Sequence, residues 1–358
     1  MKTKIIAARR LLALLLLLAL FLLLAALACM PWQRGTPKLA APWCALHLLN
    51  FTSDSSLIRL EAQLPQLAAA GVNMLILEVD YGFSWRSHPE LRGSARPITR
   101  AGARRFVKAC RRQGIALVPE FQCFGHQSWA GTTFALLTRY PEFDLTPGAY
   151  PGNKGIYCRE WDPLNPKVHA TVFNLLDELI EAFDADMLHV GMDEVFLIGD
   201  SLSPATFGKN PASVFTGVVK DLHRHIVGKR HKQMMMWGDR LIDGEKYDLG
   251  EWEAAKNGTA AAVDSIPKDI IICDWHYELR QEYPSLPMFL EKGFQVLPTS
   301  WKNAEAAGAL FHYSASLNHP RMLGHLFTLW SGKRDSLAWW PPLAQLGRQV
   351  RGTLPDKP

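Results

Sequence analysis

Short runs of consecutive hydrophobic residues recur along the chain after residue 42, and stretches with helical hydrophobic spacing separate them. Continuous rather than alternating hydrophobicity is typical of strands that are buried on both faces, as in a parallel sheet. A strand followed by a helix, repeated eight times, predicts an α/β fold of the closed (β/α)8 TIM barrel type. The predicted strands are Trp43–Leu49, Asn73–Val79, Ile115–Phe121, Met187–Met192, Gln233–Trp237, Ile270–Trp275, Gln295–Trp301 and Met322–Trp330.

The stretches between these strands carry residues that start and interrupt helices. Thr99 is suited to cap the N-terminus of a helix. Asn165-Pro166 and Asn210-Pro211 each place a capping residue before a proline, which is favoured in the first helical turn. Pro65 should kink or stop the first helix, because proline lacks a backbone N–H and clashes with the preceding turn.

One long segment, Gln122–Asp162, lacks either pattern and is rich in glycine, proline and aromatic residues. Long irregular loops in compact domains are usually functional, and in TIM barrels the loops that follow strands form the catalytic face. We therefore expect this loop to contribute to the site. Cys123 and Cys158, which both lie in this segment, could pair or could be small buried apolar residues.

The first residues of the chain are typical of an export segment. A basic cluster precedes Leu11–Ala28, a run of 18 residues without a polar side chain. The run is longer than most signal-peptide cores and is barely long enough to span a bilayer, so a cleaved signal peptide and a membrane anchor both remain open. Cys29 offers a third possibility, lipidation, although Ala26 stands where that motif prefers leucine.

These features predict the organisation of the chain. We expect an exported protein that is periplasmic, secreted or membrane-anchored. The predicted segments are a signal peptide or N-terminal anchor at 1–28, a linker at 29–42 and the barrel domain at 43–358.

The charge balance argues against a nucleic-acid partner. The chain has 39 basic and 34 acidic residues, a formal charge of +5. Four of the basic residues lie in the first 28 positions, so residues 29–358 carry 35 basic and 34 acidic side chains. A domain without an excess of basic residues lacks the positive surface that binds a phosphate backbone. The cysteines also show no zinc-type spacing, and we expect neither a metal nor a cofactor.

Several of the later predicted strands end in a tryptophan. In TIM barrels the active site is built at these C-terminal strand ends. One such tryptophan alone is more often part of the core, but four at matching strand ends favour a ligand that stacks on indole faces, such as a sugar ring. The four are Trp237, Trp275, Trp301 and Trp330.

Asp193 and Glu194 follow the fourth predicted strand. Adjacent acids are common by chance, but two carboxyl groups inside an aromatic cup repel each other and lose water, which favours one protonated and one ionised group. Most glycosidases need a second carboxylate across the scissile bond. The seventh strand end, 298–302, has no acid. Its absence favours a mechanism in which the substrate supplies its own nucleophile.

Two motifs resemble glycoside hydrolase family 20, the β-N-acetylhexosaminidases. The run His189-Val-Gly-Met-Asp193-Glu194 is similar to the family's His-x-Gly-x-Asp-Glu signature. The segment 118–129, with Gly125-His126, is similar to the family's third-strand segment, and its Gln-x-Phe-Gly-His form is closer to the hexosaminidase D-like branch. The resemblance covers the chain from about residue 43 to residue 331.

The resemblance implies an exo-acting enzyme that removes terminal β-linked N-acetylglucosamine or N-acetylgalactosamine from a glycan, with retention of configuration. It implies that Glu194 is the general acid and base. It also implies that Asp193 orients the substrate's 2-acetamido group, whose carbonyl oxygen attacks the anomeric carbon. The substrate-binding candidates are His126, Trp237, Trp275, Tyr277, Trp301 and Trp330.

Three positions depart from the family pattern. His47 lies on the first predicted strand, where the family often has an arginine that binds sugar hydroxyls. Lys302 occupies the usual place of a tyrosine that supports the acetamide, and no acid follows Trp330. Tyr277 is our candidate for the missing tyrosine, or it is structural. The departures leave open a catalytically silent glycan-binding barrel, or a glycosidase for another 2-acetamido sugar linkage.

Other polar residues near strand ends allow two interpretations each. His126 could orient Glu194, contact the sugar or be a buried structural imidazole. His189 is expected to be structural, because it lies within a strand of the barrel. Glu78 and Asp80 close the second predicted strand, where either could bind a sugar hydroxyl or form a salt bridge.

Overall fold

The computed structural model describes residues 42–330 and 335–352. The predicted export segment 1–28, Cys29 and nearly all of the predicted linker lie outside the described residues. Within the described ranges, no helix is both long enough and apolar enough to cross a membrane.

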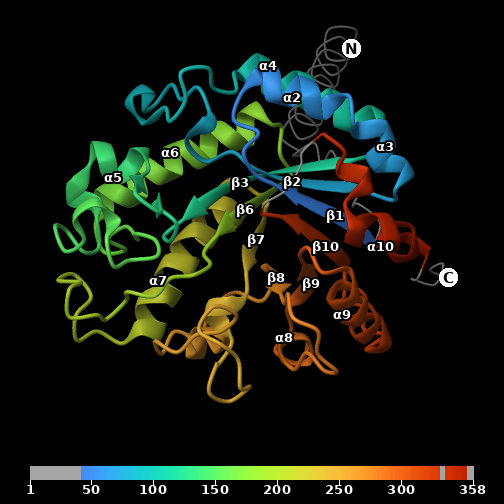
Figure 1. Cartoon of the computed structure of the whole chain (residues 1–358). Coiled ribbons are helices and arrows are strands. Elements are labelled where there is room, and N and C mark those ends of the chain that lie inside the picture. Colours follow the sequence, from blue (N-terminus) through green and yellow to red (C-terminus); the bar gives the residue numbers. More distant parts are fainter. Residues whose placement is uncertain (1–41, 331–334, 353–358) are drawn as a thin grey trace, which may run out of the picture. The chain divides into compact units, whose positions relative to one another are not determined.

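In this part of the chain, eight parallel strands close into a barrel (Figure 1), which confirms the predicted TIM barrel. Each predicted run forms one barrel strand, with ends within two residues of the prediction. The order around the barrel is β1, β10, β9, β8, β7, β6, β3, β2. The strands are β1 (Trp43–Leu48), β2 (Met74–Glu78), β3 (Ala116–Cys123), β6 (Met187–Gly191), β7 (Gln233–Trp237), β8 (Ile271–Trp275), β9 (Gln295–Ser300) and β10 (Gly324–Leu329).

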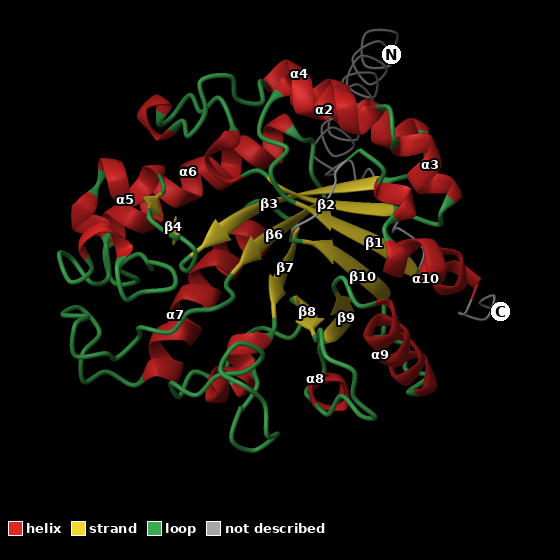
Figure 2. Cartoon of the chain, in the orientation of Figure 1, coloured by secondary structure: helices red, strands yellow, loops and turns green. Residues whose placement is uncertain are grey.

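Helices surround the strands on the outside of the barrel (Figure 2). An α-helix connects each strand to the next, as in right-handed βαβ units, except between β7 and β8, where the chain forms two short 3₁₀ helices, Asp239–Leu241 and Ala260–Asp264, instead of the α-helix that we predicted. The α-helices are α2 (Asp54–Glu61), α3 (Leu64–Ala69), α4 (Arg100–Arg112), α5 (Ala135–Arg139), α6 (Pro166–Ala182), α7 (Pro211–His223), α8 (Ser285–Glu291), α9 (Ala304–Ser316) and α10 (Pro341–Gly352).

The predicted helix signals act as expected. The Thr99 hydroxyl accepts a hydrogen bond of 3.0 Å from a backbone N–H in the first turn of α4. Asn165 and Asn210 cap α6 and α7 in the same way. The first helical segment is divided into α2 and α3 just before Pro65. Caps of this kind each stabilise a helix by about 1 kcal/mol.

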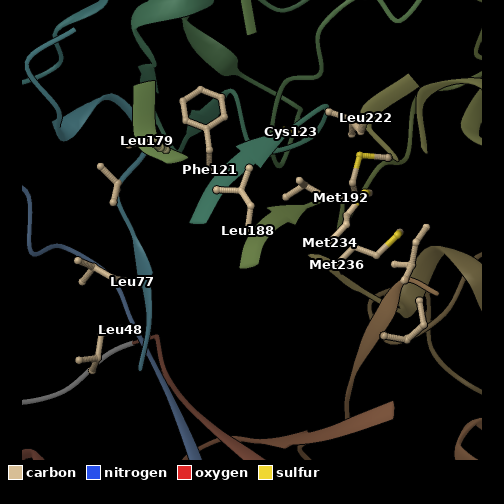
Figure 3. Packing of buried hydrophobic residues seen from close by; sticks show 14 of the residues in the cluster. Leu48, Leu77, Phe121, Cys123, Leu179, Leu188, Met192, Leu222, Met234 and Met236 are labelled. Atoms are coloured by element: carbon tan, nitrogen blue, oxygen red, sulfur yellow. The ribbon is translucent and has the colours of Figure 1, made fainter. Parts of the chain in front are cut away.

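Alternation along the strands separates two hydrophobic layers. Figure 3 shows Met234 and Met236 of β7 in the layer that packs against the helices, which also contains Leu222 of α7. Met235 and Trp237 of the same strand belong instead to the cluster inside the barrel. Successive side chains of a strand point to opposite faces, so every second residue enters the barrel interior. This period places Trp237 at the inner end of β7.

A polar layer lies inside the barrel, below the ends of the strands. Glu120 of β3 contacts His47 Nε2 of β1 at 2.7 Å and His189 Nδ1 of β6 at 3.0 Å. These three side chains are fully buried. His47 Nδ1 also lies 2.8 Å from the Thr328 hydroxyl of β10. Since these contacts join four strands, β10, β1, β3 and β6, through the barrel interior, they fix the positions of these strands relative to one another.

The long loop after β3 is more ordered than we predicted. It contains a two-stranded hairpin, β4 (Ser128–Trp129) and β5 (Thr132–Thr133), followed by α5. The pairing of Cys123 with Cys158 that the sequence left open does not occur. Both cysteines are buried free thiols, as are the three others among the described residues.

Candidate active site

The chain leaves β6 in an unusual conformation that presents Asp193 and Glu194 at the strand end. Gly191 has a φ of +64°, and a Cβ at this position would lie 1.6 Å from the side chain of Gln122. Met192 and Glu194 also have positive φ values, of 76° and 51°. Left-handed backbone is unfavourable for such residues and is concentrated at functional sites. Only glycine at position 191 lets β3 and β6 approach closely enough.

His126 joins the two acids. Its Nε2 atom lies 2.9 Å from Glu194 Oε2 and 3.3 Å from Asp193 Oδ2. Burial disfavours the charged imidazole, but the negative charge of Asp193 and contacts with both carboxylates outweigh it and raise the pKa of His126 well above its usual value. His126 therefore carries a positive charge between the acids at neutral pH. Of the roles left open by the sequence, the structure supports orientation of Glu194.

A network of side chains fixes the turn that carries His126. The Gln127 amide donates to the backbone carbonyls of Gln122 at 3.1 Å and Gly125 at 2.8 Å. Its carbonyl oxygen accepts a 2.6 Å hydrogen bond from the Tyr81 hydroxyl. Because all these partners are buried or nearly so, the turn holds the imidazole in place without help from solvent.

Gly125 is packed directly against the acid pair, and this predicts a cost for any side chain there. A Cβ at this position would lie 2.6 Å from the backbone oxygen of Asp193. We expect Gly125→Ala to lower the free energy of unfolding in urea by about 1–3 kcal/mol, as overpacking does. Gly131→Ala is the matched control, because no atom lies within 4 Å of its Cβ position. Equal effects of the two substitutions would contradict the predicted contact.

Asp239, just after β7, holds the backbone of Glu194 in place. Its Oδ2 atom accepts the backbone N–H of Glu194 at 2.9 Å and the Arg240 Nε–H at 2.6 Å. Burial is the main cause that raises the pKa of Asp239 to about 6, and the nearby Asp193 adds to it, while Arg240 opposes it. The Arg240 guanidinium also donates to the carbonyls of Glu251, Trp252 and Ala254 at 2.6–3.1 Å. Arg240 thus links Glu194 to the loop after β7.

The predicted aromatic residues lie together at the strand ends. The Trp237 and Trp330 rings are 5.7 Å apart, and Trp330 Nε1 donates to the Tyr277 hydroxyl at 2.6 Å. Tyr277 stacks on Trp275 at 4.9 Å and meets Trp301 at 5.5 Å. We call these five residues, Trp237, Trp275, Tyr277, Trp301 and Trp330, the inner aromatic cluster.

The inner aromatic cluster lies beside the acid pair. Burial raises the pKa of Tyr277 well above its usual value, and the charges of Asp193 and Glu194 act in the same direction. Electrostatic influence of this kind requires proximity. Tyr277 therefore stays protonated. The eight residues that the sequence proposed form two contact groups near the C-terminal strand ends: the acid pair with His126, and the inner aromatic cluster.

Three further aromatic residues near Glu194 were missed. Trp129 and Tyr157 belong to the long loop after β3, and Trp252 belongs to the loop after β7. The Trp129 ring stacks on His126 at 6.3 Å, and the Tyr157 ring lies 5.3 Å from Trp129 and 4.6 Å from Trp252. The aromatic content of the first loop was a usable signal for two of them. Trp252 does not follow a strand end, and no signal in the sequence places it near the site.

In the described part of the chain, two groups of side chains could geometrically hold a metal ion. They are His47, Glu78 and Glu120, and His126, Asp193 and Glu194, whose ligand atoms lie within 4.8 Å of one another. In each group a histidine already contacts a carboxylate: His47 contacts Glu120, and His126 contacts both Asp193 and Glu194. The expectation of no metal stays a prediction.

Glu78 and Asp80 form no salt bridge with any described residue, so that interpretation was wrong. Asp80 Oδ1 instead accepts the backbone N–H of Gln122 at 2.8 Å. Burial raises the pKa of Glu78 well above its usual value and that of Asp80 to about 7. Binding of a sugar hydroxyl by either residue stays a prediction.

Comparison with known proteins points to one family. The model described as "Glycosyl hydrolase family 20, catalytic domain" matches residues 62–304. The beta-hexosaminidase of Emericella nidulans is 24% identical over 266 residues, which are 68% of this chain and 40% of the relative. The lacto-N-biosidase of Bifidobacterium bifidum is 28% identical over 165 residues, 43% of this chain and 14% of that protein. The chain thus spans less than half of either relative.

Solved structures share the fold. The chitobiase of Flavobacterium johnsoniae has a TM-score of 0.60 at 22% identity, over 86% of this chain and 48% of that one. A β-N-acetylhexosaminidase of Bacteroides fragilis has a TM-score of 0.59 at 15% identity, over 86% of this chain and 65% of that one. At these identities the likeness establishes the barrel architecture.

Proposed function

The chain belongs to glycosyl hydrolase family 20, and on that premise we propose that it is an exo-acting β-N-acetylhexosaminidase with a retaining, substrate-assisted mechanism. It would release terminal β-linked N-acetylglucosamine or N-acetylgalactosamine from a glycan. The acid pair, its histidine and the inner aromatic cluster each supply one part of this chemistry.

One unpartnered atom carries the proposal. Asp193 Oδ2 is engaged by His126, whereas Asp193 Oδ1 is buried and has no hydrogen-bond partner among the described residues. A buried carboxylate oxygen without a donor is costly, and a substrate N–H placed there would remove that cost. The N–H of a 2-acetamido group is such a donor. Held in this way, the acetamide directs its carbonyl oxygen towards the anomeric carbon.

Tyr277 completes the acetamide site. Its hydroxyl oxygen accepts a hydrogen bond from Trp330 Nε1, which leaves the phenolic proton free to donate. Because burial keeps the phenol neutral, it can donate to the acetamide carbonyl oxygen. Asp193 and Tyr277 then bind opposite ends of one amide. As the carbonyl oxygen attacks, positive charge develops on the amide, and ionised Asp193 stabilises it.

Glu194 acts on the leaving group. As general acid it donates a proton to the glycosidic oxygen, and as general base it later activates water for attack on the cyclised intermediate. His126 keeps the Glu194 carboxyl oriented, and Asp239 fixes the backbone of Glu194. The sugar ring would stack on the inner aromatic cluster, where the buried Trp237 Nε1 still lacks a partner.

The test of the proposal is dependence on the 2-acetamido group. We expect kcat/KM for an aryl β-N-acetylglucosaminide to exceed that for the matching aryl β-glucoside by about 10³-fold or more, because an internal nucleophile has a very high effective molarity. A thiazoline analogue of the cyclised intermediate should inhibit competitively and bind about 10²-fold tighter than substrate. Comparable rates on both glycosides would refute the mechanism. Binding of N-acetylglucosamine without turnover would indicate a silent glycan-binding protein.

Two further proposals rest on the sequence. The basic cluster followed by the apolar run 11–28 supports export, with a cleaved, lipidated or retained N-terminus. The motif around Gly125-His126 supports placement in the hexosaminidase D-like branch. Cell fractionation, together with the mass of the mature N-terminus, distinguishes the three fates of the segment.

A further inference from the structure

Three aromatic side chains near Glu194 are open to solvent. Trp129 is 53% exposed, Trp252 is 50% exposed and Tyr157 is 37% exposed. We call these three residues the outer aromatic cluster. Single exposed hydrophobic residues are common on protein surfaces, but a contiguous exposed group usually marks a binding site. Here the rings follow one another without a gap, from Trp129 through Tyr157 to Trp252.

The outer aromatic cluster is joined to the acid pair. The Trp129 ring stacks on the ring of His126, with 28° between the two planes. Burial is the main cause that raises the pKa of Tyr157, and the charge of Glu194 and a hydrogen bond to that carboxylate add to it. The ring of Tyr157 also lies 5.9 Å from the ring of His126, the residue that contacts both acids. The cluster begins where the scissile bond must lie.

The two aromatic clusters are separate groups of rings. Among the described residues no ring contact joins the inner cluster to the outer one. The inner cluster holds the sugar whose acetamide reaches Asp193. Glu194 donates its proton to the oxygen that links this sugar to the leaving group. A surface that extends outward from Glu194 is therefore on the path of the leaving group.

The segments that carry the outer cluster are held in place before any ligand binds. Arg240 donates to the backbone carbonyl of Trp252 at 3.1 Å, and its guanidinium lies 4.7 Å above the Phe196 ring. The Gln127 N–H donates to the Arg159 carbonyl at 2.9 Å, and the Arg159 N–H donates to the Ser128 hydroxyl at 2.9 Å. Rigid aromatic surfaces lose little conformational entropy when a ligand binds.

From these observations we propose that Trp129, Tyr157 and Trp252 bind the leaving-group sugar of an oligosaccharide substrate. The C–H face of a pyranose stacks on an indole or phenol ring, and exposed rings gain most from such burial. The inference rests on the proposed function, because it assigns the sugar on the far side of the bond that Glu194 cleaves. It predicts selection for chains of at least two sugars over glycosides with a small leaving group.

The test compares two substrates that differ only in the leaving group, a β-linked disaccharide of N-acetylglucosamine and methyl β-N-acetylglucosaminide. For Trp252→Ala we expect kcat/KM on the disaccharide to fall about three- to tenfold more than on the methyl glycoside, the range expected for loss of one aromatic stacking contact. Trp252→Phe should restore most of the difference, because it keeps a ring. Trp339→Ala is the control, since this exposed tryptophan lies outside both clusters.

The outcomes separate this inference from the function on which it rests. If the wild-type protein hydrolyses neither glycoside, the proposed function fails. If it hydrolyses both and Trp252→Ala lowers the two kcat/KM values equally, the residue has a structural role and the leaving-group site is refuted. The same refutation follows if Trp252→Ala and Trp339→Ala both leave the ratio of the two values at its wild-type level.

Discussion

Replacement of Glu194 by Gln is expected to lower kcat/KM for an aryl β-N-acetylglucosaminide by about 10²–10⁴-fold, the usual contribution of a positioned general acid and base. Gln keeps the shape of the side chain and the contact with His126, but it has no proton to give. The loss should be greatest for a leaving group of high pKa and smallest for an activated phenol, because an activated phenol departs without protonation. Steady-state kinetics on a series of aryl leaving groups measures this dependence.

Two further substitutions test the assignment of Glu194 as the proton donor. Glu142→Gln changes an exposed acid of the same type and should leave the kinetics at the wild-type level. Asp193→Asn should lower the rate by about 10²–10³-fold through loss of charge stabilisation, and by a similar factor for all leaving groups. If Glu194→Gln also lowered kcat/KM by the same factor for every aryl leaving group, Glu194 would not be the proton donor.

Removal of Glu120 is expected to produce the largest loss of stability. Glu120→Ala should lower the free energy of unfolding by about 3–5 kcal/mol, because it leaves His47 and His189 in the barrel interior without their shared acid. Glu120→Gln, which fills the same space without the charge, should cost less. Urea unfolding of the three proteins gives the comparison. Equal stability of wild type and Glu120→Ala would show that the buried layer contributes nothing.

The charge of Glu120 also predicts a pH dependence. Burial opposes ionisation, but His189 and His47 outweigh it and hold the pKa of Glu120 well below its usual value. The folded-state pKa is thus lower than the unfolded one, so this contribution to stability is complete at neutral pH. It is lost as the pH falls below about 4, the unfolded value. Glu120→Gln should therefore show a weaker loss of stability between pH 5 and pH 3 than wild type.

The sequence predicted the barrel closely because the barrel follows from a local pattern. Hydrophobic runs that are buried on both faces, such as Gln233–Trp237, differ sharply from the helices between them. Asp193 and Glu194 were found because they directly follow such a run, and the four tryptophans were found in the same way. Where function depends on the end of a strand, the position of the strand identifies the residue.

The rest of the site depends on contacts between distant segments. Trp252 approaches Tyr157 across 95 positions of sequence, and no local pattern announces it. Asp80 was assigned to a possible salt bridge, because the sequence does not show that the backbone N–H of Gln122 lies beside it. The order within the loop after β3 was missed for the same reason, since its hairpin is fixed by Tyr81 and Arg159 rather than by its own composition.

Arg240 has a consequence for engineering and for divergence within the family. One guanidinium holds the aspartate below the proton donor and the carbonyls of the loop that carries Trp252. The loop therefore cannot be exchanged as an independent module, because a new loop that withdraws those carbonyls also disturbs the carboxylate beneath Glu194. Sequence changes in this loop that alter substrate range should therefore also alter turnover. Mutant libraries that vary residues 251–254 should retain the three carbonyl contacts with Arg240.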